Sequence, residues 1–308
     1  MPISIRQLAP SFAAEIRGVD LRHMPSQAVL DEIYDAFLEY GVIVLPGQAL
    51  DLDQQLAFGR LFGPLHVLPP MKGPKRRIED RAIDDVSNLK ADGSLAGANS
   101  EKAMFALGNQ LWHSDLSFCD NPAHASMLHA TEIAEEGGET EFCDLVSAYE
   151  TLDREMKAKI EGKIAVHSLA HSRVRGGHSE ADVEYLLELR PPASQPLVRT
   201  HPETGKKALF IGAHVSKIEG LDETESADLI DTLLDHAPQP ERVYSHRWAV
   251  NDLVIWDNRQ TLHRGRPYDV DNVRRVMHRV TVDGDGPNVV DGKTIEPEIR
   301  RRPVRVPA

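Results

Sequence analysis

Residues 126–144, SMLHATEIAEEGGETEFCD, contain two short β runs, Ser126–Ile133 and Thr140–Asp144, separated by a turn at Gly137-Gly138. Short runs of this kind, bounded by turn residues, are typical of antiparallel strands. Similar runs recur later in the chain, at Pro196–His201, Ala208–Ile211, Arg242–Trp248, Leu253–Trp256 and Val276–Val282. The pattern therefore favours an antiparallel β-sandwich or jelly roll.

Helical patterns flank and interrupt these runs. Gln27–Tyr40 has apolar residues near helical spacing, Gly41 follows as a helix stop, and Val42–Leu45 is then a β-branched run. Helical patterns also occur at Asp51–Phe62, Ala148–Ile160 and Glu223–His236. The sequence predicts a mostly β protein with flanking helices.

Two segments show neither the helical nor the strand spacing of apolar residues. Met71–Gly97 is rich in charge and turn formers, which predicts a long loop of the kind that often serves as a lid. No linker divides the chain, so residues 1–287 are predicted to form a single domain. The tail Asn288–Ala308 has three prolines and no periodicity, and is predicted to be an extended arm.

Composition excludes several classes of partner. The 308 residues include 35 Lys and Arg against 48 Asp and Glu, a net charge of −13 that would repel nucleic acid and anionic lipid. The start MPISIRQLAP has no signal-peptide pattern, and no apolar run approaches the roughly 18 residues of a membrane helix. With only two cysteines, we expect a cytoplasmic protein with no membrane partner.

A metal site is the sharpest chemical hypothesis. On a strand, His113 and Asp115 would point to the same face, although chance alone gives about one His-x-Asp in such a chain. His263, expected in a loop just beyond the run Leu253–Trp256, is the best third ligand. Two histidines and one carboxylate suit non-haem Fe(II), with Zn(II) as the alternative metal.

A cationic pair follows at Arg275 and Arg279. Their even spacing on a strand would place both guanidiniums on one face, where each could bind a carboxylate bidentately. The alternative is a solvated basic strand edge. Thr140 offers a hydroxyl to an anion, or is simply a strand residue of good β propensity.

Taken together, these motifs resemble the Fe(II)/α-ketoglutarate-dependent taurine and 2,4-dichlorophenoxyacetate dioxygenase family. The likeness runs from Leu8 to Val282 and rests on motifs in order along the chain: Gly47-Gln48-x-Leu50, Phe62-Gly63-Pro64, Asn109-Gln110-Leu111-Trp112-His113-x-Asp115, Gly137-Gly138-x-Thr140, Trp256-Asp257-Asn258 with His263-Arg264, and Arg275 with Arg279.

The resemblance implies a double-stranded β-helix, or jelly roll, with iron at one open end. It implies His113, Asp115 and His263 as iron ligands, and O2 and α-ketoglutarate as cosubstrates. Arg275 and Thr140 would meet the far carboxylate of α-ketoglutarate. The acid group of the substrate would meet Arg279, with Asn109 and Lys72 nearby.

Within the family, the runs Gly138–Asp144, Pro196–His201 and Leu209–His214 are similar to those of the aryloxyacetate enzymes. This similarity implies a small anionic aromatic substrate such as 2,4-dichlorophenoxyacetate, hydroxylated at the ether-bearing carbon to give a phenol, glyoxylate, succinate and CO2. Taurine or another alkylsulfonate, another small carboxylate, and a non-catalytic anion-binding jelly roll remain alternatives. The resemblance also implies a homo-oligomer.

Overall fold

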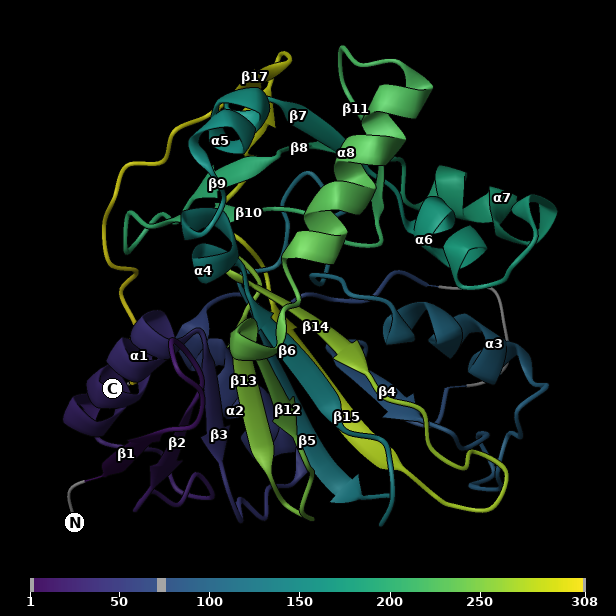
Figure 1. The fold of residues 1–308 in the computed structure, drawn as a ribbon. Helices are drawn as coiled ribbons and strands as arrows, with labels where there is room; N and C mark the ends of the chain where they lie inside the picture. Colours follow the sequence, from purple (N-terminus) through teal and green to yellow (C-terminus); the bar gives the residue numbers. More distant parts are fainter. Residues whose placement is uncertain (1–2, 71–75, 307–308) are drawn as a thin grey trace.

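The computed structural model describes residues 3–70 and 76–306, and it consists of β-strands with helices outside them (Figure 1). The strands are β1 Ser4–Gln7, β2 Ala14–Arg17, β3 Val42–Leu45, β4 Ile83–Ser87, β5 Ala125–Glu132, β6 Thr140–Asp144, β7 Ile164–His167, β8 Ala193–Pro196, β9 Val198–Thr200, β10 Lys207–Leu209, β11 Val215–Ile218, β12 Val243–His246, β13 Leu253–Asp257, β14 Thr261–Gly265, β15 Val276–Val282, β16 Val289–Val290 and β17 Lys293–Thr294. The helices are α1 Gln27–Tyr40, α2 Leu52–Phe62, α3 Glu101–Leu107, α4 Leu145–Glu150, α5 Arg154–Ile160, α6 Leu169–Arg175, α7 Glu180–Leu189 and α8 Glu223–His236, with short 3₁₀ helices η1 Gly108–Gln110 and η2 Pro240–Arg242.

The largest sheet has the order β1-β2-β3-β13-β5-β15-β4, and it is covered on both faces. Because side chains alternate along a strand, Ile43 and Leu45 of β3 join the cluster formed with α1 and α2. Val42 and Val44 of the same strand point to the other face, toward Phe142 of β6. Burial on both faces explains why β3 is an unbroken apolar run.

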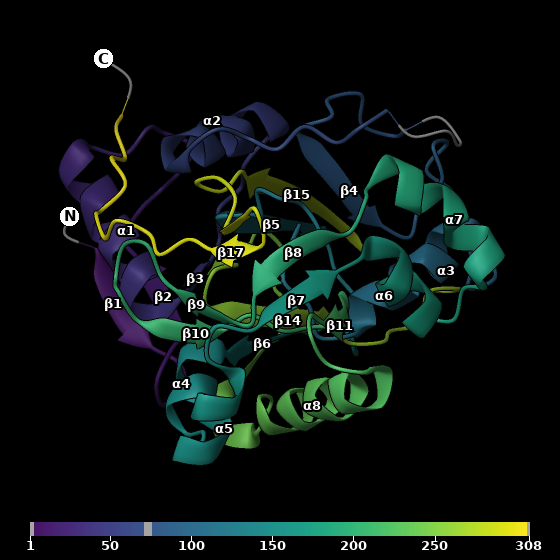
Figure 2. The same ribbon diagram turned by 90° about the horizontal axis from the view of Figure 1, so that it is seen from above.

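A smaller sheet, β12-β6-β14, lies against that second face. Its own outer side is covered by α4 and α8, which pack with Cys143 of β6 and Leu262 of β14. Seen from above, α2 and α8 therefore lie on opposite sides of the strands (Figure 2). The layers therefore run helix, sheet, sheet, helix. Strands β5 and β15 of the large sheet face strands β6 and β14 of the small sheet across the space between the two sheets.

Several predicted elements are confirmed with their bounds, namely those at residues 27–40, 42–45, 140–144, 223–236 and 276–282. Two predicted elements each divide into two. The helix predicted at Ala148–Ile160 is broken because the Asp153 side chain accepts a hydrogen bond from the backbone N–H of Met156 and starts α5 anew. The strand predicted at Pro196–His201 is interrupted at Leu197, between β8 and β9.

The prediction that Met71–Gly97 is wholly a loop is wrong, because the segment contains β4. This strand, IDDVS, is an edge strand that pairs only with β15 in the described sheet, so it has no continuous apolar pattern to reveal it. Lys72, in the same segment, lies outside the described residues. The segment Ala170–Arg190 forms most of α6 and α7. No helix within residues 3–70 and 76–306 has the length and apolar character to cross a membrane.

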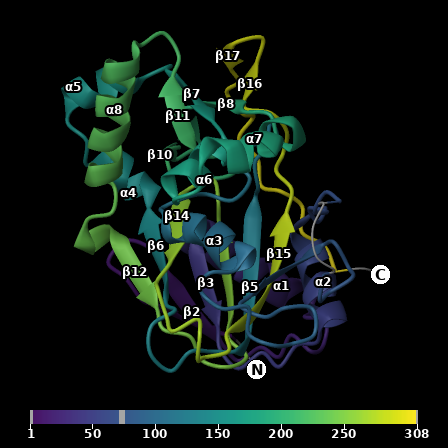
Figure 3. The same cartoon turned by 90° about the vertical axis from the view of Figure 1, so that its right-hand side faces the viewer.

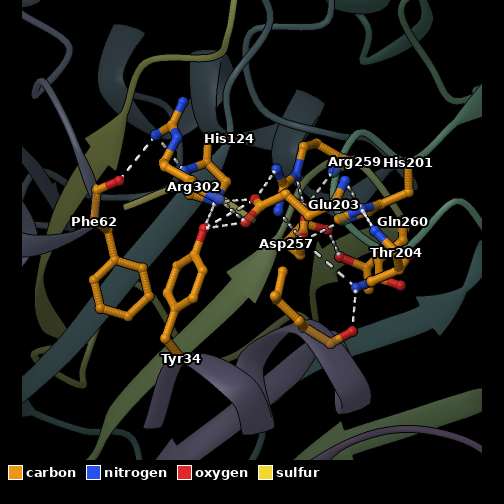
Figure 4. Close-up of polar contacts among 12 residues, drawn as sticks. Tyr34, Phe62, His124, His201, Glu203, Thr204, Asp257, Arg259, Gln260 and Arg302 are labelled. Carbon is orange, nitrogen blue, oxygen red and sulfur yellow. Dashed lines mark hydrogen bonds and ion pairs between the residues drawn. The ribbon is translucent and has the colours of Figure 1, made fainter. Parts of the chain in front are cut away.

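The C-terminal segment begins with the paired short strands β16 and β17, and Arg302 anchors the residues that follow them (Figure 4). Nη1 of Arg302 lies 2.6 Å from Nδ1 of His124, and its backbone N–H donates to Glu203 at 2.6 Å. Glu203 in turn accepts from Arg259, which also pairs with Asp257 at 2.7 Å. The tail is thus connected by buried polar groups to the residues that begin the β13–β14 turn.

Candidate active site

His113 and His263 face each other across an isolated antiparallel bridge. The N–H of His113 donates to the carbonyl of His263 at 3.0 Å, and the reverse bond is 2.9 Å long. His263 lies inside strand β14, so the expectation of a loop residue is wrong. One ligand atom each of His113, Asp115 and His263 lies within 4.8 Å of the others, and all three residues are buried. The structure therefore brings the three predicted ligands together.

The protonation of the cluster suits a divalent cation. Nδ1 of His113 donates to the carbonyl of Leu111 at 2.7 Å, which leaves Nε2 to ligate. Burial lowers the pKa of His113 and takes that of His263 well below its ordinary value, so both rings are neutral at pH 7. Nε2 of His263 is 3.8 Å from Oδ2 of Asp115, and Nδ1 of His263 has no partner among the described residues.

Asp115 is held by a small polar network. Its Oδ2 accepts from the Ser126 hydroxyl at 2.6 Å, and its backbone N–H donates to Oδ1 of Asn258 at 3.0 Å. Nδ2 of Asn258 donates to the same Ser126 hydroxyl at 2.9 Å. Burial opposes ionisation of Asp115, but the charge of Arg279, the two neighbouring imidazoles and the Ser126 hydrogen bond together outweigh it and hold the Asp115 pKa well below its usual range. A charged carboxylate and two neutral imidazoles fit Fe(II) with open positions for a chelating cosubstrate.

Arg279 binds two carboxylates. Its Nη1 is 2.6 Å from Oδ1 of Asp115, and its Nη2 is 2.7 Å from Oδ2 of Asp84 on β4. The alternative of a solvent-exposed basic edge describes Arg274 instead, because that side chain is exposed and pairs with Glu132. A pocket partly open to solvent is lined by His66, Leu68, Ala82, Asp84, Asp115, Leu116, Arg279 and Thr281.

Arg275 is buried beside Gly138, just before β15. Its Nη2 donates to the carbonyl of Gly138 at 3.1 Å, its guanidinium lies 5.5 Å from the centre of the Tyr268 ring, and no described carboxylate forms an ion pair with it. The pairing of β15 with β5 shifts register between Val276 and Met277, and Arg275 lies before this shift. The alternation of side chains along β15 therefore does not determine which way the Arg275 side chain points. Thr140 is buried, and its hydroxyl accepts from Nε1 of Trp248 at 3.1 Å, which leaves the hydroxyl hydrogen to donate.

Asn109 lies in η1, where its Oδ1 accepts from Nη2 of Arg173 at 3.4 Å. Arg173 belongs to α6, which contacts η1 and lies close to α3 (Figure 3). Sequence reasoning missed Arg173, Asp84 and Ser126 as members of the site. Of these, Asp84 falls within Met71–Gly97, the segment predicted to be a lid-like loop, and no pattern described above indicates Arg173 or Ser126.

Comparison with known proteins agrees with this geometry. The model of the family described as taurine catabolism dioxygenase TauD, TfdA family matches residues 4–281. The chain is 42% identical over 285 residues to the α-ketoglutarate-dependent 2,4-dichlorophenoxyacetate dioxygenase of Cupriavidus pinatubonensis, covering 92% of this chain and 99% of that protein. It is 38% identical over 288 residues to the (S)-phenoxypropionate/α-ketoglutarate-dioxygenase of Sphingobium herbicidovorans, covering 91% and 95%.

A solved structure is similar over almost the whole fold. The crystal structure of AAD-2 in complex with Mn(II) and N-oxalylglycine superposes with a TM-score of 0.83 at 39% sequence identity. The alignment covers 94% of this chain and 100% of that one.

Proposed function

Because the chain belongs to the taurine catabolism dioxygenase TauD, TfdA family, we propose that it hydroxylates the ether-bearing carbon of an aryloxyalkanoate such as 2,4-dichlorophenoxyacetate. The products would be a phenol, glyoxylate, succinate and CO2. The chain is an oxidoreductase that requires Fe(II), α-ketoglutarate and O2. The observation that carries the proposal is the buried cluster of His113, Asp115 and His263, with Arg279 paired to Asp115 and a buried Arg275 that has no carboxylate partner among the described residues.

The roles of the residues follow from their surroundings. His113, Asp115 and His263 would hold Fe(II), which with α-ketoglutarate and O2 supplies the oxidising equivalent for hydroxylation. Arg275 has no carboxylate partner among the described residues, and the Thr140 hydroxyl has a hydrogen to donate. These two groups would fix the far carboxylate of α-ketoglutarate, with the guanidinium binding it as a fork.

The substrate would lie in the pocket next to Asp115. Arg279 would orient its acid group, with Asn109 and Lys72 assisting. Leu68, Ala82 and Leu116 line this pocket beside the charged groups. Such apolar walls suit an aryl ring.

We also propose that the two facing sheets form a double-stranded β-helix. The layered arrangement and the likeness to AAD-2 support it. In this fold residues 1–287 would make one domain, residues 288–308 would remain an extended tail, and the protein would assemble as a homo-oligomer.

The experiment that tests the function is succinate release from α-ketoglutarate across a panel of substrates. The panel contains aryloxyacetates, both enantiomers of aryloxypropionates, and taurine, with phenol release measured in parallel. We expect equal amounts of succinate and phenol with an aryloxyalkanoate. Turnover with taurine alone would overturn the proposed substrate class and keep the chemistry.

A further inference from the structure

Arg173 on α6 is a buried cation whose partners do not account for its charge. Its side chain is 6% exposed, and Nε has no hydrogen-bond partner among the described residues. Its Nη2 donates to Oδ1 of Asn109, a neutral amide, at 3.4 Å. No carboxylate in the described chain forms an ion pair with it. An unpaired buried charge is costly, so such a residue in a site suggests an anionic ligand.

The surroundings of Arg173 hold its guanidinium in one place. It stacks 4.1 Å from the centre of the Phe105 ring, and a Cβ at position 108 would lie only 1.9 Å from its Nη1. Only glycine at that position allows so close an approach. A planar guanidinium fixed between a ring and a backbone loses little further freedom when it binds a carboxylate.

Arg173 lies next to the elements that carry the metal ligands. Its helix α6 contacts η1, and η1 contacts β14, the strand that carries His263. Burial lowers the pKa of Arg173 to about 10, so the guanidinium stays protonated at neutral pH.

A count of charges around the site leaves the positive charge of Arg173 available for one further anion. Asp84, Asp115 and Arg279 together carry one net negative charge. Fe(II) and the metal-chelating carboxylate of α-ketoglutarate would bring this group to neutrality, and the far carboxylate of α-ketoglutarate would neutralise Arg275. A substrate carboxylate would then be an uncompensated buried charge unless Arg173 met it.

We propose that Arg173, with the Asn109 amide beside it, binds the acid group of the substrate and selects anionic over neutral substrates. Arg279 would share that acid group while it remains paired with Asp84. Asn109 accepts from Arg173 through Oδ1, so its Nδ2 can donate to the same carboxylate. This inference rests on the proposed function and names the residue that supplies its substrate preference.

The test measures binding of two probes of the same shape, phenoxyacetate and the neutral phenoxyacetamide. Calorimetry is carried out without oxygen on protein loaded with Fe(II) and α-ketoglutarate. Arg173→Met removes the charge and keeps an unbranched stem against Phe105, and Arg173→Gln is a second variant that removes the charge. Arg175→Gln is the matched control, because Arg175 is exposed on the same helix.

We expect Arg173→Met to weaken phenoxyacetate binding by at least about 30-fold, the lower end for loss of one partner of a buried charge pair. Binding of phenoxyacetamide should change by less than about threefold, which shows that the pocket remains intact, and Arg175→Gln should alter neither. Equal losses for both probes, or no loss for phenoxyacetate, would overturn the inference. Wild-type protein that does not prefer the acid to the amide would also overturn it.

Phenol release separates this inference from the proposed function. An Arg173-dependent preference for phenoxyacetate without phenol release keeps the anion site and rejects the function. Phenol release that is unchanged in Arg173→Met and Arg173→Gln keeps the function and rejects the role of Arg173.

Discussion

Nη1 of Arg279 lies 2.6 Å from Oδ1 of Asp115, so a proposed iron ligand is also the ion-pair partner of an arginine. The same guanidinium reaches Asp84 on the edge strand β4. The arginine therefore joins the metal site to the pocket wall, and its removal should affect the metal-free and metal-bound protein differently.

Arg279→Ala should destabilise the metal-free protein and make metal binding more stabilising. Loss of the arginine leaves Asp115 buried without its cation, at a cost of about 3 kcal/mol or more. A divalent ion would restore a positive charge next to Asp115. In thermal melts, Mn(II) should therefore raise the melting temperature of Arg279→Ala by more than that of the wild type. Arg274→Ala is the control, since its exposed pair with Glu132 contributes about 0–1 kcal/mol.

His113→Ala and His263→Ala should each abolish the complex with Fe(II) and α-ketoglutarate. Each removes one of three ligands from a buried cluster, and neither alanine offers a replacement donor. The measurement is the weak visible charge-transfer band of the anaerobic complex, with His23→Ala as an exposed control. A band that persists in both variants would contradict the ligand assignment.

Arg275→Ala should raise the KM for α-ketoglutarate far more than the KM for substrate, and Arg279→Ala should do the reverse. The reason is that the two arginines are expected to bind different carboxylates, and Arg275 lies beside Gly138 rather than in the pocket of Arg279. Initial rates of succinate release give both constants. Equal effects of both variants on both constants would mean that the two anions are wrongly assigned.

Stability should fall on acidification, and His167 should contribute measurably to the fall. Burial lowers the pKa of His167 to about 3, against an ordinary value of 6.5, and its Nε2 has no partner among the described residues. Below pH 6.5, His167 binds a proton in the unfolded chain but stays neutral in the folded chain. The free energy of unfolding should therefore drop by about 1.4 kcal/mol per pH unit for this group.

The matched variant is His167→Gln, which keeps a polar side chain that can hydrogen-bond the hydroxyl of Ser117. In urea unfolding at pH 7 and pH 5, its loss of stability between the two pH values should be about 2 kcal/mol smaller than that of the wild type. Identical losses in the two proteins would show that His167 does not titrate as described.

Arg302→Ala should release the tail and lower stability by about 2 kcal/mol or more, because it removes a largely buried guanidinium from His124 and from Asp285. Arg301→Ala is the control in thermal melts, since Arg301 is 42% exposed and pairs with the more exposed Asp35. Similar melting temperatures for the two variants would show that the tail is not anchored through Arg302.

The sequence predicted the parts of this site that depend on local spacing. His113 and Asp115 are two residues apart and share a site, and Thr140 begins a strand with the predicted bounds. The edge strand β4 was missed because it pairs on one side only and has a polar sequence, IDDVS. Asp84, which binds Arg279, was missed with it.

Arg173 could not be found from local patterns. It stands two residues from Arg175 on one short helix, yet the first is buried and the second exposed. The difference arises because α6 contacts η1, and the residues that meet there, Asn109 and Arg173, are 64 positions apart. Such contacts form only in the folded protein, and the amino-acid sequence of α6 alone does not indicate them.

The bridge between His113 and His263 bears on how the protein acquires its metal. Two backbone hydrogen bonds, 3.0 and 2.9 Å long, fix the separation of these residues without any ion. Little chain entropy is then left for metal binding to remove, and the apoprotein should be a folded, reloadable species that exchanges one divalent ion for another without passing through the unfolded state.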